Sequence, residues 1–340
     1  MKYLSLWRVW LKTYVLAGLA GWVAQAFSIP LPWMIGPLFI TAGLRVSSGV
    51  VVNAPMYGRQ IGQWGVGLAL GLYFTPSVVI EIFREWPFIL ASCFLAFGLS
   101  AMGTYMLWQK FGVRLSTAYF SAAIGGASEM AVLAEKNGGQ LDLVAAAHSL
   151  RVMIVVVTIP FAYQYLGVYG DGQDIGNLIP FDWLGLGALL TVSATGIICA
   201  KIIRLPNPFI LGALISVAII TGLGYRWSSW PVELSAVAQL LIGVSLGVRF
   251  NSEFLRQAPR LVLGICMYTT LSLLISLIFA WVVSRLSGID VPTIVLGTTP
   301  GGIAEMCITA KVLHLGVAVV TVFHVIRMGI VLVLTQPIYK

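Results

Sequence analysis

Apolar segments follow one another along almost the whole chain, and this pattern restricts the protein to the membrane class. Hydrophobic residues make up 59% of the 340 residues, whereas soluble domains contain about 45–50%. Most segments approach the ~20 residues that a helix needs to cross ~30 Å of hydrocarbon. The apolar runs span residues 7–27, 31–46, 57–74, 86–109, 116–134, 141–163, 183–203, 207–224, 233–249, 262–284, 292–310 and 317–339. We therefore predict an all-α polytopic membrane protein.

The sequence repeats itself at an offset of 176 residues without a gap. The motif Gly-Gly-x-x-Glu-Met occurs at residues 125–130 and again at 301–306. The same offset aligns Pro30 with Pro206, Pro32 with Pro208, Gly36 with Gly212, Gln63 with Gln239, Gly67 with Gly243, Gly71 with Gly247, His148 with His324 and Arg151 with Arg327. Such self-similarity indicates a duplication. We predict a first repeat at 1–164, an acidic external linker at 165–180 and a second repeat at 181–340.

Charge predicts that the two repeats are inverted. The N-terminus carries Lys2, Arg8 and Lys12, whereas the region between the repeats carries Asp171, Asp174 and Asp182 without Lys or Arg. The positive-inside rule then places the N-terminus in the cytoplasm and the linker outside. Each repeat has six apolar runs, but this change of side needs an odd number of crossings, so one run does not cross.

The run at 116–134 is the best candidate for the segment that does not cross. With this choice most Lys and Arg lie on the cytoplasmic side, whereas choosing 31–46 would put more of them outside. We predict two inverted repeats, each with five transmembrane helices and one re-entrant Gly-Gly hairpin. A broken helix that crosses fully is the alternative for each Gly-Gly segment.

The Gly-Gly pairs are expected at the tips of these segments. Arms of about nine residues reach ~13 Å, close to the bilayer midplane. Non-helical backbone at that depth is tolerated only against protein or a water-filled cavity. Two facing tips would form a binding site of the kind that secondary transporters use. The predicted substrate- and ion-binding residues are Gly125, Gly126, Ser128, Glu129, His148, Arg151, Gly301, Gly302, Glu305, His324, Arg327, Gln63 and Gln239.

The charged residues of this site allow two interpretations. Glu129 with Arg151, and Glu305 with Arg327, could form structural ion pairs that lock the segments. The histidines instead favour proton transfer, because imidazole titrates near physiological pH, and charged groups inside a membrane are functional candidates by default. The two glutamines lie in Gln-x-x-x-Gly-x-x-x-Gly helices, which suit either helix packing or a place in the site.

Composition argues against several other functions. The net charge is +8, but Lys and Arg lie mainly at the ends of apolar runs, so no nucleic-acid partner is expected. The four cysteines show no CxxC spacing and are interpreted as core residues. Three histidines, two of them in corresponding positions of the repeats, do not supply the imidazole cluster of a copper site. We expect no cofactor, no metal and no enzymatic activity.

The repeated motif, the His-x-x-Arg that follows each Glu by nineteen residues, and the Pro-x-Pro-x-x-x-Gly segments resemble the AbrB-duplication membrane family over essentially the whole chain. Members carry labels such as ammonia monooxygenase or regulator, and the family shares its name with an unrelated soluble DNA-binding regulator. The segment WGVGLALGLYFTP is more distantly similar to the bile acid:sodium symporter and cation:proton antiporter superfamily, whose sites lie at crossed, discontinuous helices. The Asn-Asp or Asp-Asp ion sites of that superfamily have no match here, which favours protons over sodium.

The sequence therefore predicts a secondary active transporter of a small, anionic organic solute, coupled to protons and working by alternating access. A membrane sensor that keeps the transporter fold without turnover is the main alternative, and a membrane-embedded enzyme is a weaker one. The expected partners are the solute, protons and the lipid bilayer. Whether two copies form a homodimer is left open. We expect a multi-pass protein of a bacterial inner (cytoplasmic) membrane with both termini in the cytoplasm.

Overall fold

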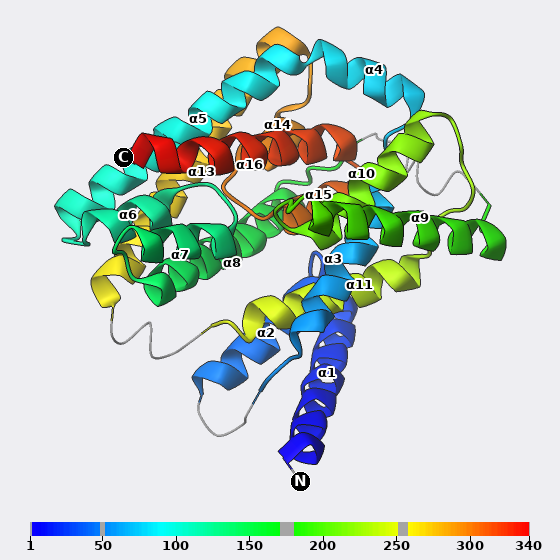
Figure 1. Cartoon of the computed structure of the whole chain (residues 1–340), viewed down its shortest axis with the longest axis horizontal. Helices are drawn as coiled ribbons and strands as arrows, with labels where there is room; N and C mark the ends of the chain where they lie inside the picture. Colours follow the sequence, from blue (N-terminus) through cyan, green and yellow to red (C-terminus); the bar gives the residue numbers. More distant parts are fainter. Residues whose placement is uncertain (1, 48–51, 171–179, 251–257, 340) are drawn as a thin grey trace. The chain divides into compact units, whose positions relative to one another are not determined.

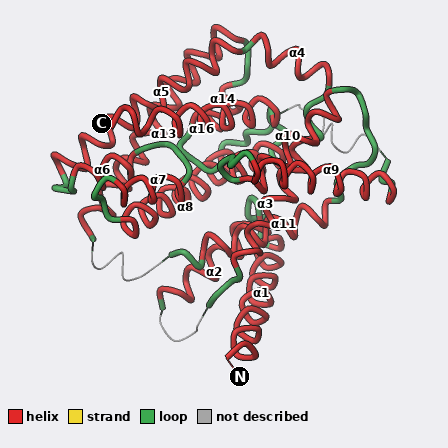
Figure 2. The backbone as a smooth tube through the Cα atoms, in the orientation of Figure 1, coloured by secondary structure: helices red, strands yellow, loops and turns green. Residues whose placement is uncertain are grey.

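The structure, a computed structural model, describes residues 2–47, 52–170, 180–250 and 258–339. Within these ranges the chain forms helices joined by short loops, without a β-strand (Figures 1 and 2). The predicted all-α class is confirmed. Asp171 and Asp174, and with them most of the predicted acidic linker, lie outside the described residues.

The helices recur with the 176-residue offset of the sequence. Four pairs match at both ends: α2 (Pro32–Val46) with α10 (Pro208–Gly222), α3 (Met56–Gly71) with α11 (Val232–Gly247), α6 (Leu115–Ala122) with α14 (Val291–Thr298), and α7 (Ala127–Lys136) with α15 (Ile303–Val312). The other helices are α1 (Lys2–Ala26), α4 (Pro76–Arg84), α5 (Trp86–Tyr105), the π-helical η1 (Met106–Lys110), α8 (Leu141–Tyr165), α9 (Trp183–Ile202), α13 (Pro259–Ser287) and α16 (Val317–Tyr339). The duplication is therefore present in the backbone as well.

Even unusual backbone conformations recur at this offset. Leu31 and Asn207, the N-caps of α2 and α10, are left-handed with φ of 50° and 46°. A proline follows each of them, and its fixed φ suits the first position of a helix. The Pro-x-Pro segments of the sequence are thus the starts of these two helices.

The first compact unit comprises Met1–Val79 and Pro160–Ser252. In it α2 packs against α11 and α3 packs against α10, so helices of one repeat pack on helices of the other. Glycines allow the close approach, because a Cβ on Gly67 would collide with the carbonyl of Ile210, and one on Gly243 with the carbonyl of Met34. This explains the repeated glycine spacing as helix packing.

The second compact unit comprises Ile80–Ile159 and Glu253–Lys340. It contains α5 to α7, most of α8, and α13 to α16, hence both Gly-Gly motifs. The compact units do not follow the repeat boundaries, because each unit combines the corresponding half of both repeats. This division arises from contacts between segments far apart in sequence.

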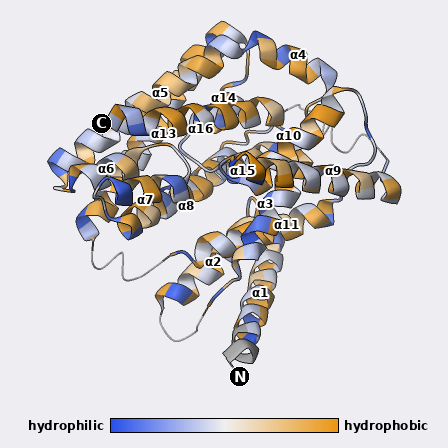
Figure 3. Ribbon diagram, in the orientation of Figure 1, coloured by the Kyte–Doolittle hydropathy of each residue, from blue (hydrophilic) through white to orange (hydrophobic). Residues whose placement is uncertain are grey.

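Five described helices are long and apolar enough to cross a membrane: α5 continued by η1, α8, α9, α13 and α16. The pair α3 and α4, bent by 89°, would make a sixth span, while α10 and α11 are shorter apolar helices. Hydrophobic residues recur along the whole length of many helices (Figure 3), as expected for helices surrounded by lipid. Helix length and composition therefore support a multi-pass membrane protein, with five or six candidate spans among the described helices. The ten crossings and the inverted repeats stay a prediction.

Candidate functional site

Both Gly-Gly segments are hairpins in which the chain doubles back. The backbone N–H of Gln140, just after α7, donates to Thr117 Oγ1 near the start of α6 at 3.1 Å. Gly316 donates in the same way to Thr293 Oγ1, also at 3.1 Å. In a fully crossing broken helix these ends would be about 30 Å apart, so this alternative is excluded. We call residues 115–136 hairpin 1 and residues 291–312 hairpin 2.

The second glycine of each motif makes room for the glutamate. Gly126 and Gly302 are the N-caps of α7 and α15. The Oε2 atoms of Glu129 and Glu305 occupy the space that a Cβ on these glycines would fill. Each carboxylate therefore folds back over the N-terminus of its own helix, where the helix dipole stabilises negative charge.

The first glycine of each motif makes room for the methionine. A Cβ on Gly125 would lie 2.8 Å from Met130 Cε, and one on Gly301 would lie 2.7 Å from Met306 Cγ. Both methionines are fully buried. The motif Gly-Gly-x-x-Glu-Met is thus a single packing unit, in which each glycine accommodates one specific side chain.

A buried His–Arg pair of α8 caps the C-terminus of α6, the first helix of hairpin 1. His148 Nε2 lies 2.8 Å from the Phe120 carbonyl, and its Nδ1 lies 3.0 Å from Arg151 Nη2. Arg151 Nη1 donates to the carbonyls of Ser121, Ala122 and Ala123 at 3.1–3.3 Å. These carbonyls are the last of α6, and a cation at a helix C-terminus is favourable.

Hairpin 2 repeats the arrangement. His324 Nε2 lies 2.8 Å from the Leu296 carbonyl, and its Nδ1 lies 2.8 Å from Arg327 Nη2. Arg327 Nη1 donates to the carbonyls of Gly297 and Thr298, at 3.2 and 2.9 Å.

These contacts fix the chemical state of the histidines. A guanidinium has no acceptor, so the Nδ1 atom that faces it must accept, and Nε2 must carry the proton that it donates to the carbonyl. Both histidines are therefore neutral and orient the arginines. Among the described residues, neither Glu129 with Arg151 nor Glu305 with Arg327 forms an ion pair. The glutamates remain the candidate proton carriers.

Several buried polar atoms in and beside hairpin 1 bind nothing in the described chain. They are Ser116 Oγ, Ser121 Oγ and Glu129 Oε2 of the hairpin and Arg151 Nε of α8. Most buried polar atoms in proteins are paired, and an unpaired group points to water, an ion or a ligand. The predicted Ser128 lies beside Glu129 and is exposed.

The tips of both hairpins meet the middle of long helices. Ile124, just before Gly125, shares a hydrophobic cluster with Val331 of α16. A Cβ on Gly301 would lie 3.1 Å from Val155 of α8. Val331 and Val155 lie four residues, about one helical turn, after Arg327 and Arg151. All predicted residues of the two hairpins, with their His–Arg pairs, belong to the second unit.

Gln63 and Gln239 lie on α3 and α11 of the first unit and are half-buried. Sequence analysis missed Tyr268, a fully buried residue of α13 whose hydroxyl donates to the Ala122 carbonyl at 2.8 Å. The repeat gave no signal for it, because Ser92 stands at the corresponding position. Within the described ranges, no three His, Cys, Asp or Glu side chains gather to hold a metal ion.

Comparison with known proteins agrees with these motifs. The family model described as "Transition state regulatory protein AbrB" matches residues 33–340. The chain belongs to the AbrB family. It is 26% identical to "Uncharacterized protein YhjN" of Bacillus subtilis (strain 168), over 94% of this chain and 89% of that protein. It is 25% identical to "Putative regulator AbrB" of Escherichia coli (strain K12), over 92% of this chain and 90% of the relative. The family that the sequence resembles is confirmed.

Proposed function

We propose that this AbrB-family protein is a secondary transporter that carries a small organic anion together with protons. The observation that carries the proposal is a pair of buried, unpaired atoms: Glu129 Oε2 in hairpin 1 and Arg151 Nε of α8, whose guanidinium binds the end of α6. A purely structural charge cluster would be expected to satisfy such atoms internally. The unused carboxylate oxygen can take up a proton, and the unused N–H of the guanidinium can donate to an anion.

Contacts along α16 support an inverted arrangement of the two hairpins. Gly316, just before α16, meets Thr293 near the start of hairpin 2. Nineteen residues further, the Thr335 carbonyl accepts from the Tyr119 hydroxyl of hairpin 1 at 2.8 Å. This stretch of helix covers about 28 Å, close to the thickness of the hydrocarbon core. Hairpins that start at opposite ends of one span would be re-entrant from opposite faces, as alternating access requires.

The position of the glutamates suggests how anion and proton would be coupled. Each ionised carboxylate occupies the N-terminus of its own helix, a place that attracts negative charge. Protonation would neutralise it and leave the helix N-terminus without an anion. A solute carboxylate would then bind best when the glutamate is protonated, which corresponds to symport of an anion with a proton.

Transport by purified protein in proteoliposomes tests this proposal. A panel of small mono- and dicarboxylates is offered with and without an imposed pH gradient. Wild-type protein should accumulate at least one anion faster with the gradient. Glu129→Gln or Glu305→Gln should abolish the gradient-driven part, because the amide cannot titrate. Since neither glutamate has an ion-pair partner in the described chain, both variants should melt close to wild type.

The control and the contradicting outcome use the same preparations. Gly329→Ala is a suitable control, because a Cβ at this position of α16 meets nothing within 4 Å. If both Gln variants transport with an unchanged pH dependence, the glutamates are not proton carriers. If no anion of the panel moves under any gradient, the transport proposal fails.

A membrane sensor is the second candidate, since the name of the Escherichia coli relative describes a regulator. A sensor would bind an anion saturably in the same assay but would show no counterflow. We also propose that the protein lies in a bacterial inner membrane with both termini in the cytoplasm and has no enzymatic activity. Accessibility of cysteines introduced near Lys12 to an impermeant thiol reagent would test the orientation.

A further inference from the structure

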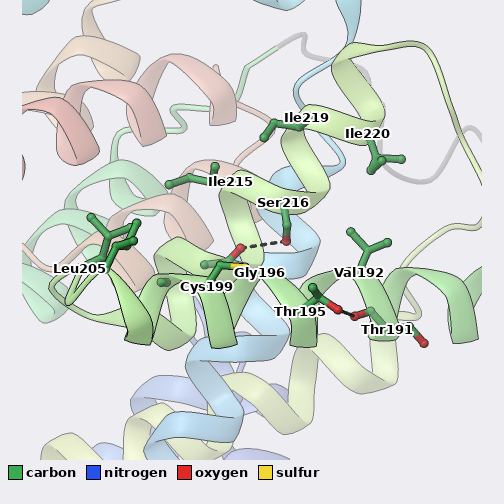
Figure 4. A pocket seen from close by; sticks show the side chains of 13 residues that line it. Thr191, Val192, Thr195, Gly196, Cys199, Leu205, Ile215, Ser216, Ile219 and Ile220 are labelled. Carbon is green, nitrogen blue, oxygen red and sulfur yellow. Dashed lines mark hydrogen bonds between the residues drawn. The ribbon is translucent and has the colours of Figure 1, made fainter.

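An apolar groove lies between α9 and α10 in the first unit (Figure 4). Its volume is about 440 Å³. The two helices cross at Gly196 and Gly212, where a Cβ on either glycine would collide with or crowd the carbonyl of the other. The close crossing places Thr195, Cys199 and Ser216 along the walls.

The walls are apolar although several of these residues carry hydroxyls. Ser216 Oγ donates to the Gly212 carbonyl at 2.8 Å, and Thr195 Oγ1 donates to the Thr191 carbonyl at 2.9 Å. Both hydroxyls are thus bonded within their own helices, so the groove offers mainly hydrocarbon and suits an apolar occupant.

Three residues that line the groove are smaller than their counterparts in the first repeat. At the positions of Ser216, Thr195 and Cys199, the first repeat has the larger Ile40, Leu19 and Val23. The small side chains at these positions leave space between α9 and α10.

The groove lies on a helix that is long and apolar enough to span the membrane, and the most apolar window of α9 is only 33% buried. Ile198 and Ile219, on the same two helices, are more than half exposed. The lining residues of α9 run from Thr191 to Ile203, which is about 18 Å of helix. One leaflet of hydrocarbon is about 15 Å thick, so the groove matches the length of one leaflet.

Two basic residues lie at one end of the groove. Lys201 and Arg204 are exposed and stand next to Ile203 and Leu205, which line it. The Lys201 ammonium lies 4.3 Å from the centre of the Phe209 ring at the start of α10, which holds it between the two helices. The first repeat has Gln25 and Ser28 at these positions, without charge.

We propose that this groove binds an anionic phospholipid, with one acyl chain between α9 and α10 and the phosphate at Lys201 and Arg204. Basic residues beside a groove between transmembrane helices are the usual means of recognising anionic lipids. A second copy of the chain fits less well. In a two-fold dimer around the membrane normal, the same residues of both copies lie at the same depth, so Lys201 and Arg204 would face like charges.

Lipid retention by the full-length protein tests the proposal. The protein is reconstituted in nanodiscs with equal amounts of phosphatidylglycerol and phosphatidylcholine, released gently, and analysed for bound lipid by native mass spectrometry. We expect one phosphatidylglycerol to be retained roughly thirtyfold more than phosphatidylcholine, since each basic residue contributes about fivefold. Equal retention of the two lipids would overturn the proposal.

Substitutions that introduce the corresponding residues of the first repeat separate the effect of the basic charges from the effect of the groove's shape. Lys201→Gln with Arg204→Ser should abolish the preference and still allow phosphatidylcholine to bind, whereas Ser216→Ile or Cys199→Val should reduce retention of both lipids. Arg226→Gln, an exposed basic residue beyond the other end of α10, is the matched control and should change nothing. Melting temperatures show whether Ser216→Ile and Cys199→Val still fold, and either variant alone is enough for the test. The lipid site would be contradicted if Lys201→Gln with Arg204→Ser still preferred phosphatidylglycerol. It would also be contradicted if the protein were a dimer that Ser216→Ile dissociates.

Discussion

Hairpins 1 and 2 have the same backbone but offer different surroundings to their glutamates. The helix bounds, the glycine contacts and the His–Arg pairs coincide at the 176-residue offset. Yet Glu129 is half-buried beside the exposed Ser128, whereas Glu305 is 4% exposed beside the buried Ala304. The shared motif thus fixes the shape of each hairpin, while neighbouring residues set the polarity around each carboxylate.

The two tips also differ in backbone hydrogen bonding. Ile124 donates its N–H to Ser100 Oγ at 3.3 Å. Pro300 occupies the corresponding position in hairpin 2 and has no N–H to donate, and the buried Ser276 Oγ, the counterpart of Ser100, has no partner in the described chain. In addition, Tyr268 supports the end of α6 only. The tip of hairpin 1 is therefore held by a side-chain hydrogen bond that the tip of hairpin 2 lacks.

Removal of the arginines should have the largest effect on stability. Arg327→Ala leaves the carbonyls of Gly297 and Thr298 without this donor, at about 1–3 kcal/mol for each orphaned group. Arg151→Ala should cost about as much: it removes a donor from three carbonyls, but the Tyr268 hydroxyl still donates to Ala122, so two carbonyls are orphaned here as well. Melting temperatures in detergent compare the two variants.

The contribution of Tyr268 can be isolated by a double-mutant cycle. Tyr268→Phe should be mild in the wild-type background and markedly worse in Arg151→Ala, because the Ala122 carbonyl then loses both donors. In Arg327→Ala the same change should be additive. A Tyr268→Phe effect of equal size in the Arg151→Ala and Arg327→Ala backgrounds would contradict the assigned difference between the hairpins.

Alanine at the second glycine should have the next largest effect. In Gly302→Ala the new Cβ displaces the buried Glu305 carboxylate, and such overpacking typically costs about 1–3 kcal/mol. Gly126→Ala should cost less than about 1 kcal/mol, because the half-buried Glu129 can turn toward solvent. Glu305→Ala should restore most of the stability of Gly302→Ala, since it removes the displaced group. Thermal unfolding of the single and double variants measures this, and a fully additive double variant would refute the contact.

The sequence predicted the hairpins well because their signals are local. A glycine pair, a glutamate three residues later and a matching copy 176 residues away are all visible without a structure. The partners of Arg151 and Arg327 were not visible, since carbonyls carry no sequence signal and the ends of α6 and α14 depend on where each hairpin turns. The number of crossings stays a prediction, because runs such as 31–46 and 207–224 are as apolar as the long helices, although their helices have only 15 residues each.

The smallest predicted effect concerns the two serines that face the tips. Ser100→Ala removes a buried hydroxyl that accepts from Ile124 and donates to the Ala96 carbonyl at 2.7 Å, so it should lower the free energy of unfolding by about 0.5–1.5 kcal/mol. Ser276→Ala removes a buried hydroxyl that has no partner, so it should be neutral or slightly stabilising. Both serines lie on long apolar helices and change to the same residue, which makes each the control for the other. An equal loss in both variants, measured by thermal unfolding, would mean that Ser276 has a bound partner such as water, and would contradict the difference between the two tips.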